Sequence, residues 1–210
     1  MRREYLTGGL TEADAGDDPL DLFDRWFNDA REKCPGPWYE ANAMALATVD
    51  RAGVPSNRIV LLKDYNASGL TFFTNYQSRK AADLADRPTA AAVFHWAWLE
   101  RQVRVTGPVA QVSRQVSEAY FASRPRGSQL GAWVSNQSEP MSRQQMADRL
   151  IDVETRFADT DVPTPPHWGG YVIEPTQVEF WQGRENRLHD RLLYTRQSPA
   201  APWQRQRLGP

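Results

Sequence analysis

The 210-residue sequence has a single cysteine, Cys34, which excludes an internal disulfide and a cysteine-based metal site. Its three histidines, His95, His167 and His189, lack the spacing of zinc ligands. No apolar run approaches the roughly 18 residues of a membrane-spanning helix, and the first residues are charged rather than apolar. We therefore expect a soluble, cytoplasmic protein without a structural metal.

An excess of charge is also missing. The sequence has 25 basic and 26 acidic residues, so its net charge gives no reason to expect a nucleic acid or an anionic membrane as partner. The charges are unevenly placed, because residues 11–29 are rich in acids and Arg184–Arg207 holds six arginines and no lysine. This distribution favours local binding of small anions.

The chain reads as an arm followed by one domain. Residues 1–18, rich in glycine and acids, predict a mobile N-terminal arm, and residues 19–210 predict a single domain. Asp18 can cap a helix that has Pro19 in its first turn and ends at the breakers 34–37.

Short strands and peripheral helices dominate the rest of the sequence. We expect strands over 44–49, 57–65, 70–75, 90–98, 101–112, 170–173, 178–182, 191–196 and 203–208. Helices are expected from Ser113 to Ser123, over 128–136, and from Ser142, the last burying Met146, Leu150, Val153 and Phe157. This pattern predicts an α+β domain built on a small antiparallel barrel with Greek-key-like connections, without a dinucleotide fingerprint or a P-loop.

Two segments in the first half suit an anion. In Arg58–Lys63, alternation would bury Ile59, Leu61 and Lys63 on one side of a strand, although charges at both ends also fit an ordinary strand edge. Ser78-Arg79-Lys80 begins a helix, where backbone N–H groups and two cations could hold a phosphate. An ordinary solvated first turn is the alternative.

A third segment is a stronger oxyanion candidate. Arg124 and Arg126 flank Pro125, Ser128 follows at a helix start, and Tyr120 lies one turn before Arg124. Mid-strand Gln102 and the polar run that contains Gln137 and Ser138 add hydrogen-bonding groups that mean little alone.

The segment Phe180–Arg191 combines aromatic and basic residues, namely Trp181, Arg184, Arg187, His189 and Arg191. On an extended strand Arg187 and His189 would share a face, which suits a flat, anionic heteroaromatic ligand. A solvated basic hairpin is the alternative. Together these segments suit a ligand set with two phosphates and a flat ring. Because the sequence has no nucleophile elbow, we expect a bound cofactor to provide the reactive group.

These residues resemble the pyridoxine (pyridoxamine) 5′-phosphate oxidase family of FMN enzymes, essentially end to end. The specific motifs are RIVLLK (58–63), FFTN…SRKA (72–81), LERQV (99–103), SRPRGSQLGAWVSNQS (123–138), WGGY (168–171) and FWQGRENRLHDR (180–191). The resemblance implies an FMN-binding split β-barrel, a homodimer with FMN at its interface, and a C-terminal segment that serves dimerisation and substrate binding.

The resemblance also assigns residues. The implied FMN contacts are Arg58, Ile59, Val60, Leu61, Leu62, Lys63, Phe73, Thr74, Arg79, Lys80, Gln102, Gln137, Ser138, Trp181 and Arg191. The implied substrate contacts are Lys63, Tyr120, Arg124 and Ser128 at the phosphate, Arg187 and His189 at the reacting ring, and Arg2 and Tyr5 in the arm. Arg187 and His189 are the implied catalytic residues, and Arg184 receives no role.

The implied reaction is oxidation of pyridoxine or pyridoxamine 5′-phosphate to pyridoxal 5′-phosphate. A hydride passes from substrate C4′ to flavin N5, O2 reoxidises the flavin to give H2O2, and the amine substrate also releases ammonia. Two alternatives stay open: a related split-barrel FMN oxidase acting on another ring, as in phenazine biosynthesis, and a non-catalytic flavin- or heme-binding split-barrel protein.

Overall fold

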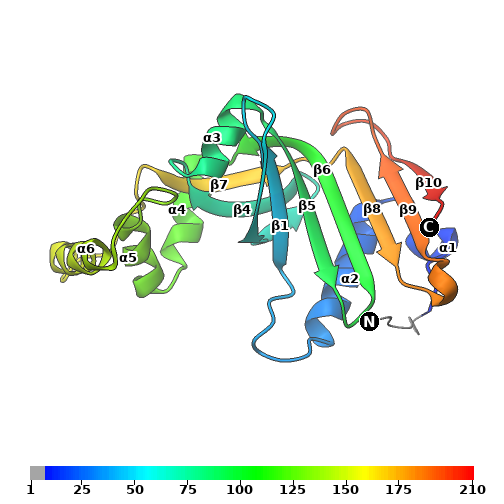
Figure 1. The fold of residues 1–210 in the computed structure, drawn as a ribbon, viewed down its shortest axis with the longest axis horizontal. Helices are drawn as coiled ribbons and strands as arrows, with labels where there is room; N and C mark the ends of the chain where they lie inside the picture. Colours follow the sequence, from blue (N-terminus) through cyan, green and yellow to red (C-terminus); the bar gives the residue numbers. More distant parts are fainter. Residues whose placement is uncertain (1–7) are drawn as a thin grey trace.

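The computed structural model describes residues 8–210 as an α+β fold around one curled antiparallel sheet (Figure 1). The strands are β1 (Ala43–Val49), β2 (Pro55–Leu61), β3 (Asp64–Asn66), β4 (Gly69–Asn75), β5 (Thr89–Trp96), β6 (Arg101–Gln111), β7 (Trp168–Ile173), β8 (Gln177–Gln182), β9 (Asp190–Thr195) and β10 (Gln204–Leu208). The helices are α1 (Glu12–Ala15), α2 (Pro19–Glu32), α3 (Arg79–Asp86), α4 (Arg114–Ala122), α5 (Arg126–Val134) and α6 (Arg143–Arg156), and Glu185–Arg187 forms the 3₁₀ turn η1. The predicted α+β split barrel is confirmed.

Strand β6 connects the two parts of the sheet. The main path runs β10-β9-β8-β6-β5-β1-β2, and β6 also pairs with β7, which continues to β4 and β3. Residues 101–106 of β6 face β8, whereas residues 109–111 pair with β7. The sheet therefore curls around a core that includes Phe72, Phe94 and Phe180.

Helix α2 forms as the sequence predicts. Asp18 caps it by accepting the backbone N–H of Leu20 at 2.8 Å, and Pro19 takes the first position, where no donor is lost. Phe23 and Trp26 are buried, and the Trp26 ring meets Phe180 of the sheet edge-on. Burying this aromatic stripe fixes α2 against one face of the sheet.

Part of the predicted arm is folded onto the C-terminal strands. Thr11 caps α1 in a capping box with Asp14, Leu10 is buried, and the Tyr194 hydroxyl donates to the carbonyl oxygen of Gly16. Residues 1–7 lie outside the described residues, so the division of the chain at residue 18 stays a prediction.

Two burial predictions are wrong. On β2 the exposed face carries Ile59, which is 66% exposed, whereas Val60 of the opposite face packs against the core. Helix α6 has no buried residue; it packs mainly on α5 at the end of the molecule (Figure 1), and Met146 and Leu150 are exposed. Of its predicted core residues, Phe157 at the C-cap is buried and Val153 is partly buried.

Within residues 8–210, no helix has the length and apolar character needed to cross a membrane.

Candidate functional site

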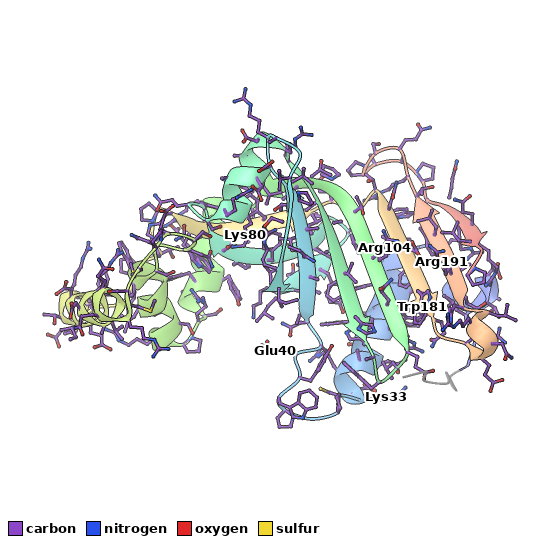
Figure 2. The ribbon with its side chains drawn as sticks, viewed as in Figure 1. Lys33, Glu40, Lys80, Arg104, Trp181 and Arg191 are labelled. Carbon is purple, nitrogen blue, oxygen red and sulfur yellow. The ribbon has the colours of Figure 1, made fainter. Side chains whose placement is uncertain are left out.

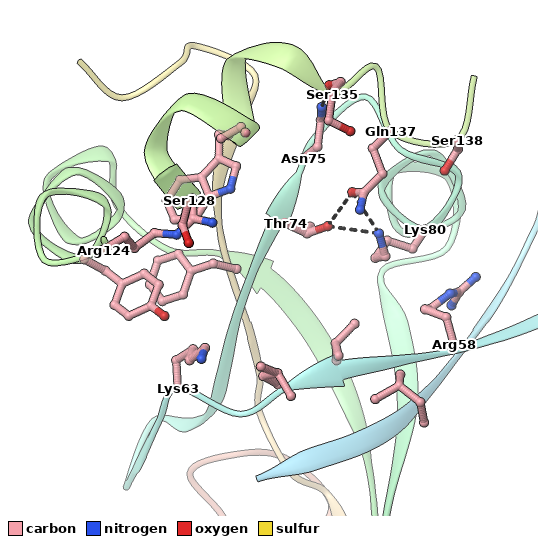
Figure 3. Close-up of a pocket in the computed structure, with 18 of the residues that line it drawn as sticks. Arg58, Lys63, Thr74, Asn75, Lys80, Arg124, Ser128, Ser135, Gln137 and Ser138 are labelled. Atoms are coloured by element: carbon pink, nitrogen blue, oxygen red, sulfur yellow. Dashed lines mark hydrogen bonds between the residues drawn. The ribbon is translucent and has the colours of Figure 1, made fainter. Parts of the chain in front are cut away.

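A cavity of about 920 Å³ opens where β2 and β4 meet the starts of α3 and α5 (Figure 3). Five cationic side chains line it, and the residues the structure places in its wall include no acidic side chain. These cations are Arg58, Lys63, Arg79, Lys80 and Arg124. The volume is in the range of small-molecule sites, and the one-sided charge suits an anionic ligand.

Lys80 is the most buried of these cations. Its ammonium donates to the side-chain oxygens of Thr74 at 2.9 Å and Gln137 at 3.2 Å (Figure 3), and to that of Ser78 at 3.2 Å. All of these partners are neutral, so burial, followed by the charge of Arg58, lowers the pKa of Lys80 to about 8. An anion bound in the cavity would stabilise the charged form of this ammonium.

A buried carboxylate orients the neighbouring arginines. Asp83 lies one turn after Arg79 on α3, accepts the Arg79 Nε–H at 2.8 Å and lies 3.7 Å from Arg58. Burial raises the pKa of Asp83, but hydrogen bonds from Thr48 and Arg79 outweigh burial, so its net pKa is lowered. Asp83 thus holds both guanidinium groups at the cavity from behind.

Arg124 rests on an aromatic stack. Its guanidinium carbon lies 4.9 Å from the centre of the Trp168 ring, and Trp168, Phe73 and Tyr120 are stacked nearly parallel. One guanidinium nitrogen, Nη1, is buried without a hydrogen-bond partner, and burial lowers the pKa of Arg124. An unsatisfied buried donor is costly, so this nitrogen is suited to an anionic ligand.

Three backbone segments close the rest of the cavity. Ser128 lies in the first turn of α5 and lines the cavity, and its own backbone N–H donates to the carbonyl oxygen of Pro125 at 2.8 Å. Ser138 accepts the backbone N–H of Arg79 at 3.1 Å, and Asn75 donates to the carbonyl oxygen of Ser135 at 3.2 Å. These bonds join α3 and β4 to the loop after α5.

A second group of predicted residues lies elsewhere, across β6, β8 and β9. Gln102 pairs with Trp181, and Trp181 pairs with Arg191, so all three side chains share one face of the sheet. Arg191 donates to Glu179 at 2.9 Å and to the carbonyl oxygen of Gly209 at 2.9 Å. We call this set, with the adjacent His189, the sheet row. Figure 2 shows its Trp181 and Arg191 separated from Lys80 by β1, β5 and β6.

Arg187 and His189 do not lie on a strand, so the condition under which their side chains would share a face is not met. Asn186 and Arg187 both have positive φ, 55° and 61°, because the chain reverses in η1 before β9 begins. The turn leaves Arg187 exposed and brings the His189 ring to 4.7 Å from the centre of the Trp181 ring. His189 therefore joins the sheet row by ring contact.

The predicted site residues thus divide into three sets. Those in the cavity wall are Arg58, Ile59, Val60, Leu61, Lys63, Phe73, Thr74, Arg79, Lys80, Tyr120, Arg124, Ser128, Gln137 and Ser138. Gln102, Trp181, Arg187, His189 and Arg191 belong to β6 and the 181–191 segment. Leu62 is buried and lines a smaller cavity beside α2, while Arg2 and Tyr5 lie outside the described residues.

Sequence reasoning gave no role to Asp83, which supports the cavity from behind, or to Trp168 in the cavity wall. Asp83 carries a readable signal, since an acid four residues after Arg79 on a helix predicts an ion pair. Trp168 lies within the WGGY motif, but nothing in the sequence indicates that it stacks under Arg124.

The fold and the cavity place this chain among split-barrel proteins with an anion-binding pocket. A solved structure of PhzG from Burkholderia lata, in complex with tetrahydrophenazine-1-carboxylic acid, has a TM-score of 0.87 and 26% identity, covering 96% of this chain and 98% of that chain. A pyridoxamine 5′-phosphate oxidase-related, FMN-binding protein from Nostoc punctiforme has a TM-score of 0.75 at 18% identity, covering 93% of this chain and 100% of that chain, and supports the fold alone.

Sequence comparison identifies the family. A family model described as pyridoxamine 5′-phosphate oxidase matches residues 32–155, and one described as the pyridoxine 5′-phosphate oxidase C-terminal dimerisation region matches residues 168–210. Proteins named pyridoxine/pyridoxamine 5′-phosphate oxidase from Rubrobacter xylanophilus and Pseudomonas fluorescens are 52% and 53% identical over all of this chain and 95% and 97% of their own lengths. The chain belongs to the pyridoxamine 5′-phosphate oxidase family.

Proposed function

We propose that this protein oxidises pyridoxine 5′-phosphate and pyridoxamine 5′-phosphate to pyridoxal 5′-phosphate, with FMN as cofactor and O2 as final acceptor. The observation that carries the proposal is the cavity of about 920 Å³ whose described wall has five cations and no carboxylate. Two phosphorylated molecules that meet in one pocket, a flavin and a substrate, require such an imbalance. Full-length identity of about 52% to oxidases of this name supports the same reaction.

We assign the FMN phosphate to the side of the cavity formed by Arg58, Arg79 and Lys80. Two guanidinium groups there are aligned by Asp83, and the ammonium of Lys80 has only neutral partners, so the residues present fit a phosphate dianion. Bound FMN would supply the two-electron chemistry, accepting a hydride from substrate C4′ and being reoxidised by O2, which is reduced to H2O2. The protein binds, orients and shields the reactants.

We assign the substrate phosphate to Lys63, Tyr120, Arg124 and Ser128 on the other side of the cavity. The buried, unpartnered Nη1 of Arg124 supplies the donor that a phosphate oxygen would satisfy. The stack of Tyr120, Phe73 and Trp168 holds that guanidinium in place from beneath. Arg187 and His189 are proposed to orient the pyridine ring and to stabilise charge that develops during hydride transfer.

We further propose that two copies of the chain complete each site. The cavity and the sheet row lie apart in one chain, yet both are assigned to the same flavin and substrate. The C-terminal match to a dimerisation region covers Trp181, Arg187, His189 and Arg191. A homodimer with FMN at its interface would bring the sheet row of one subunit to the cavity of its partner. A cytoplasmic location stays a prediction of the sequence.

A second candidate function comes from the PhzG structure, which shares the fold at 26% identity and binds a tricyclic ring acid. A phenazine-type substrate has a carboxylate but no phosphate. With such a substrate, Arg124 and Lys63 would have no substrate phosphate to bind.

An oxidase assay separates these functions. The FMN-loaded protein is expected to be yellow, and to consume O2 and release H2O2 with either phosphorylated vitamer. It should do neither with unphosphorylated pyridoxine or with a dihydrophenazine carboxylic acid. A protein that takes up FMN but oxidises only the tricyclic acid would establish the second function, and one that takes up no FMN would contradict both.

A further inference from the structure

Asp190 connects three segments beside His189. Its Oδ1 lies 2.6 Å from Arg207 Nη1, and its Oδ2 accepts the backbone N–H of Leu10 at 2.9 Å and lies 3.4 Å from Arg184 Nη1. Its side chain is 12% exposed, so these contacts replace most of its hydration. One carboxylate therefore ties together the N-terminal segment, the last strand and the turn that leads to His189.

Arg184 connects Asp190 to the imidazole of His189. Its backbone N–H donates to Nδ1 of His189 at 3.1 Å, while its side chain is held by Asp190. With Nδ1 as acceptor, the neutral ring carries its proton on Nε2. The ring of Trp181 packs against the imidazole of His189, with 4.7 Å between the two ring centres.

The packing around this contact leaves little freedom. A Cβ on Gly9 would lie 2.9 Å from Asp190 Oδ2 and 3.1 Å from Arg184 Nη1, so the backbone of the N-terminal segment passes directly over the Arg184–Asp190 pair. On the far side, Arg207 is held by both carboxylate oxygens of Glu12, at 2.8 and 2.9 Å. Asp190 is thus oriented by neighbours on two sides before it meets Arg184.

We propose that Asp190 is a positioning residue for the oxidation, acting through Arg184 to hold His189 in the tautomer with its proton on Nε2 and to fix its orientation toward the substrate. The inference rests on the proposed function, which places His189 at the reacting ring. It also gives Arg184 a role, because Arg184 reaches His189 through its backbone and Asp190 through its side chain.

The test compares the Asp190→Asn dimer with wild type, both loaded with FMN. Since the chain has three histidines, ¹⁵N-histidine labelling gives few signals, and a His189→Gln sample assigns those of His189. At a pH where the ring is neutral, wild type should show a protonated Nε2 and an unprotonated Nδ1. In Asp190→Asn the two nitrogen shifts should move toward each other as the tautomers mix.

Activity provides the second measurement. Asp190→Asn should retain FMN and lower kcat on the order of 10-fold with little change in KM, because the reacting geometry is disturbed while the phosphate grips are intact. Glu185→Gln is the matched control, since it neutralises an exposed carboxylate of the same turn and leaves the contacts of Asp190 and Arg184 in place. It should retain the wild-type nitrogen shifts and kcat.

The two measurements separate the possible failures. Unchanged nitrogen shifts in Asp190→Asn would overturn the positioning role even if activity fell, and altered shifts with normal kcat would overturn its relevance to the reaction. If wild type oxidises no phosphorylated vitamer, the proposed function fails instead. Should Asp190→Asn not fold, Arg184→Met removes the same link and must give the same shifts and the same loss of kcat, or the proposal is overturned.

Discussion

The guanidinium of Arg124 lies over the ring of Trp168 at 4.9 Å, and one of its nitrogens has no hydrogen-bond partner. The aromatic face supports the charge from one side, and Arg124 is part of the cavity wall. Without a ligand the protein bears the cost of a buried, unsatisfied donor, which is recovered when an anion binds.

Replacing Arg124 with Met should separate binding from stability. The KM for the phosphorylated substrates is expected to rise roughly 10- to 100-fold with little change in kcat, since a phosphate contact contributes to ground and transition states alike. The ligand-free protein should gain about 1 kcal/mol in free energy of unfolding, because the unsatisfied donor is removed. Steady-state kinetics and urea unfolding measure the two effects. Arg126→Met, two residues away and outside the cavity wall, should leave KM unchanged; a normal KM in Arg124→Met would refute the assignment.

Lys80 should make the ligand-free protein more stable at alkaline pH. Its pKa is lowered from 10.5 to about 8, so the unfolded chain binds more protons than the folded one between these values. Stability should therefore rise as the pH increases from about 8 to 10.5. Urea unfolding across this range should detect the rise in wild type and a smaller one in Lys80→Met. FMN affinity should fall over the same rise in pH, because the neutral amine no longer attracts the phosphate. An affinity independent of pH would remove Lys80 from the phosphate site.

Asp83→Asn should weaken both the fold and the cofactor site. Loss of this buried charge leaves Arg58 and Arg79 without their common partner, and we expect a cost of about 3 kcal/mol in free energy of unfolding. Fluorescence titration of the refolded protein with FMN should show weaker binding. Asp86→Asn, on an exposed position of the same helix, serves as the control and should change neither property. Equal FMN affinity in both variants would show that Asp83 does not organise the cavity.

Arg187→Ala and His189→Ala should lower kcat while FMN stays bound, since both residues are assigned to the substrate ring rather than the flavin. Absorbance of the bound flavin and single-turnover reduction by substrate distinguish binding from chemistry. Glu185→Ala, on the same exposed turn, is expected to behave as wild type. If flavin were lost instead, the two residues would belong to the cofactor site.

Mixed dimers test whether the two halves of a site come from different subunits. At substrate concentrations well below KM, Arg124→Met impairs the cavity and His189→Ala impairs the sheet row, so each homodimer is impaired at both sites. If sites are shared, a mixed dimer has one doubly impaired site and one intact site, and random mixing should restore roughly a quarter of wild-type activity. Co-expression with two affinity tags isolates the mixed species. No recovery beyond the average of the two homodimers would place each site within one chain.

The sequence predicts the elements of this fold well, because local signals decide them. Asp18 and Pro19 mark the start of α2, and alternation with turn residues marks most strands. Prediction from sequence fails where the burial of a residue depends on elements that are distant in the chain but adjacent in the fold. The spacing of Met146 and Leu150 resembles a buried stripe, but no element in residues 8–210 covers them. Alternation on β2 defines two faces without saying which one meets the core, and Ile59 falls on the exposed face.

The candidate site shows the same limit. Resemblance to a family finds its residues, and fourteen of them meet in one cavity although they come from segments far apart in the sequence. Neither spacing nor resemblance indicates that Asn186 and Arg187 adopt positive φ, so the sequence alone does not give the geometry of Arg187 and His189. The spacing of Arg79 and Asp83 signals their ion pair, whereas the contact of Asp190 with Arg207 is apparent only in the folded structure.

Strand β6 connects the two halves of the site, the sheet row and the cavity. Its first six residues carry the sheet row through Gln102, and its end pairs with β7, whose first residue is Trp168. At Gly107 a side chain is impossible, because a Cβ would lie 2.0 Å from the carbonyl oxygen of Glu174. The separation between cavity and row is thus a fixed length of extended chain, independent of the loops. In the proposed dimer, β6 would therefore help to set the distance between the two reaction centres.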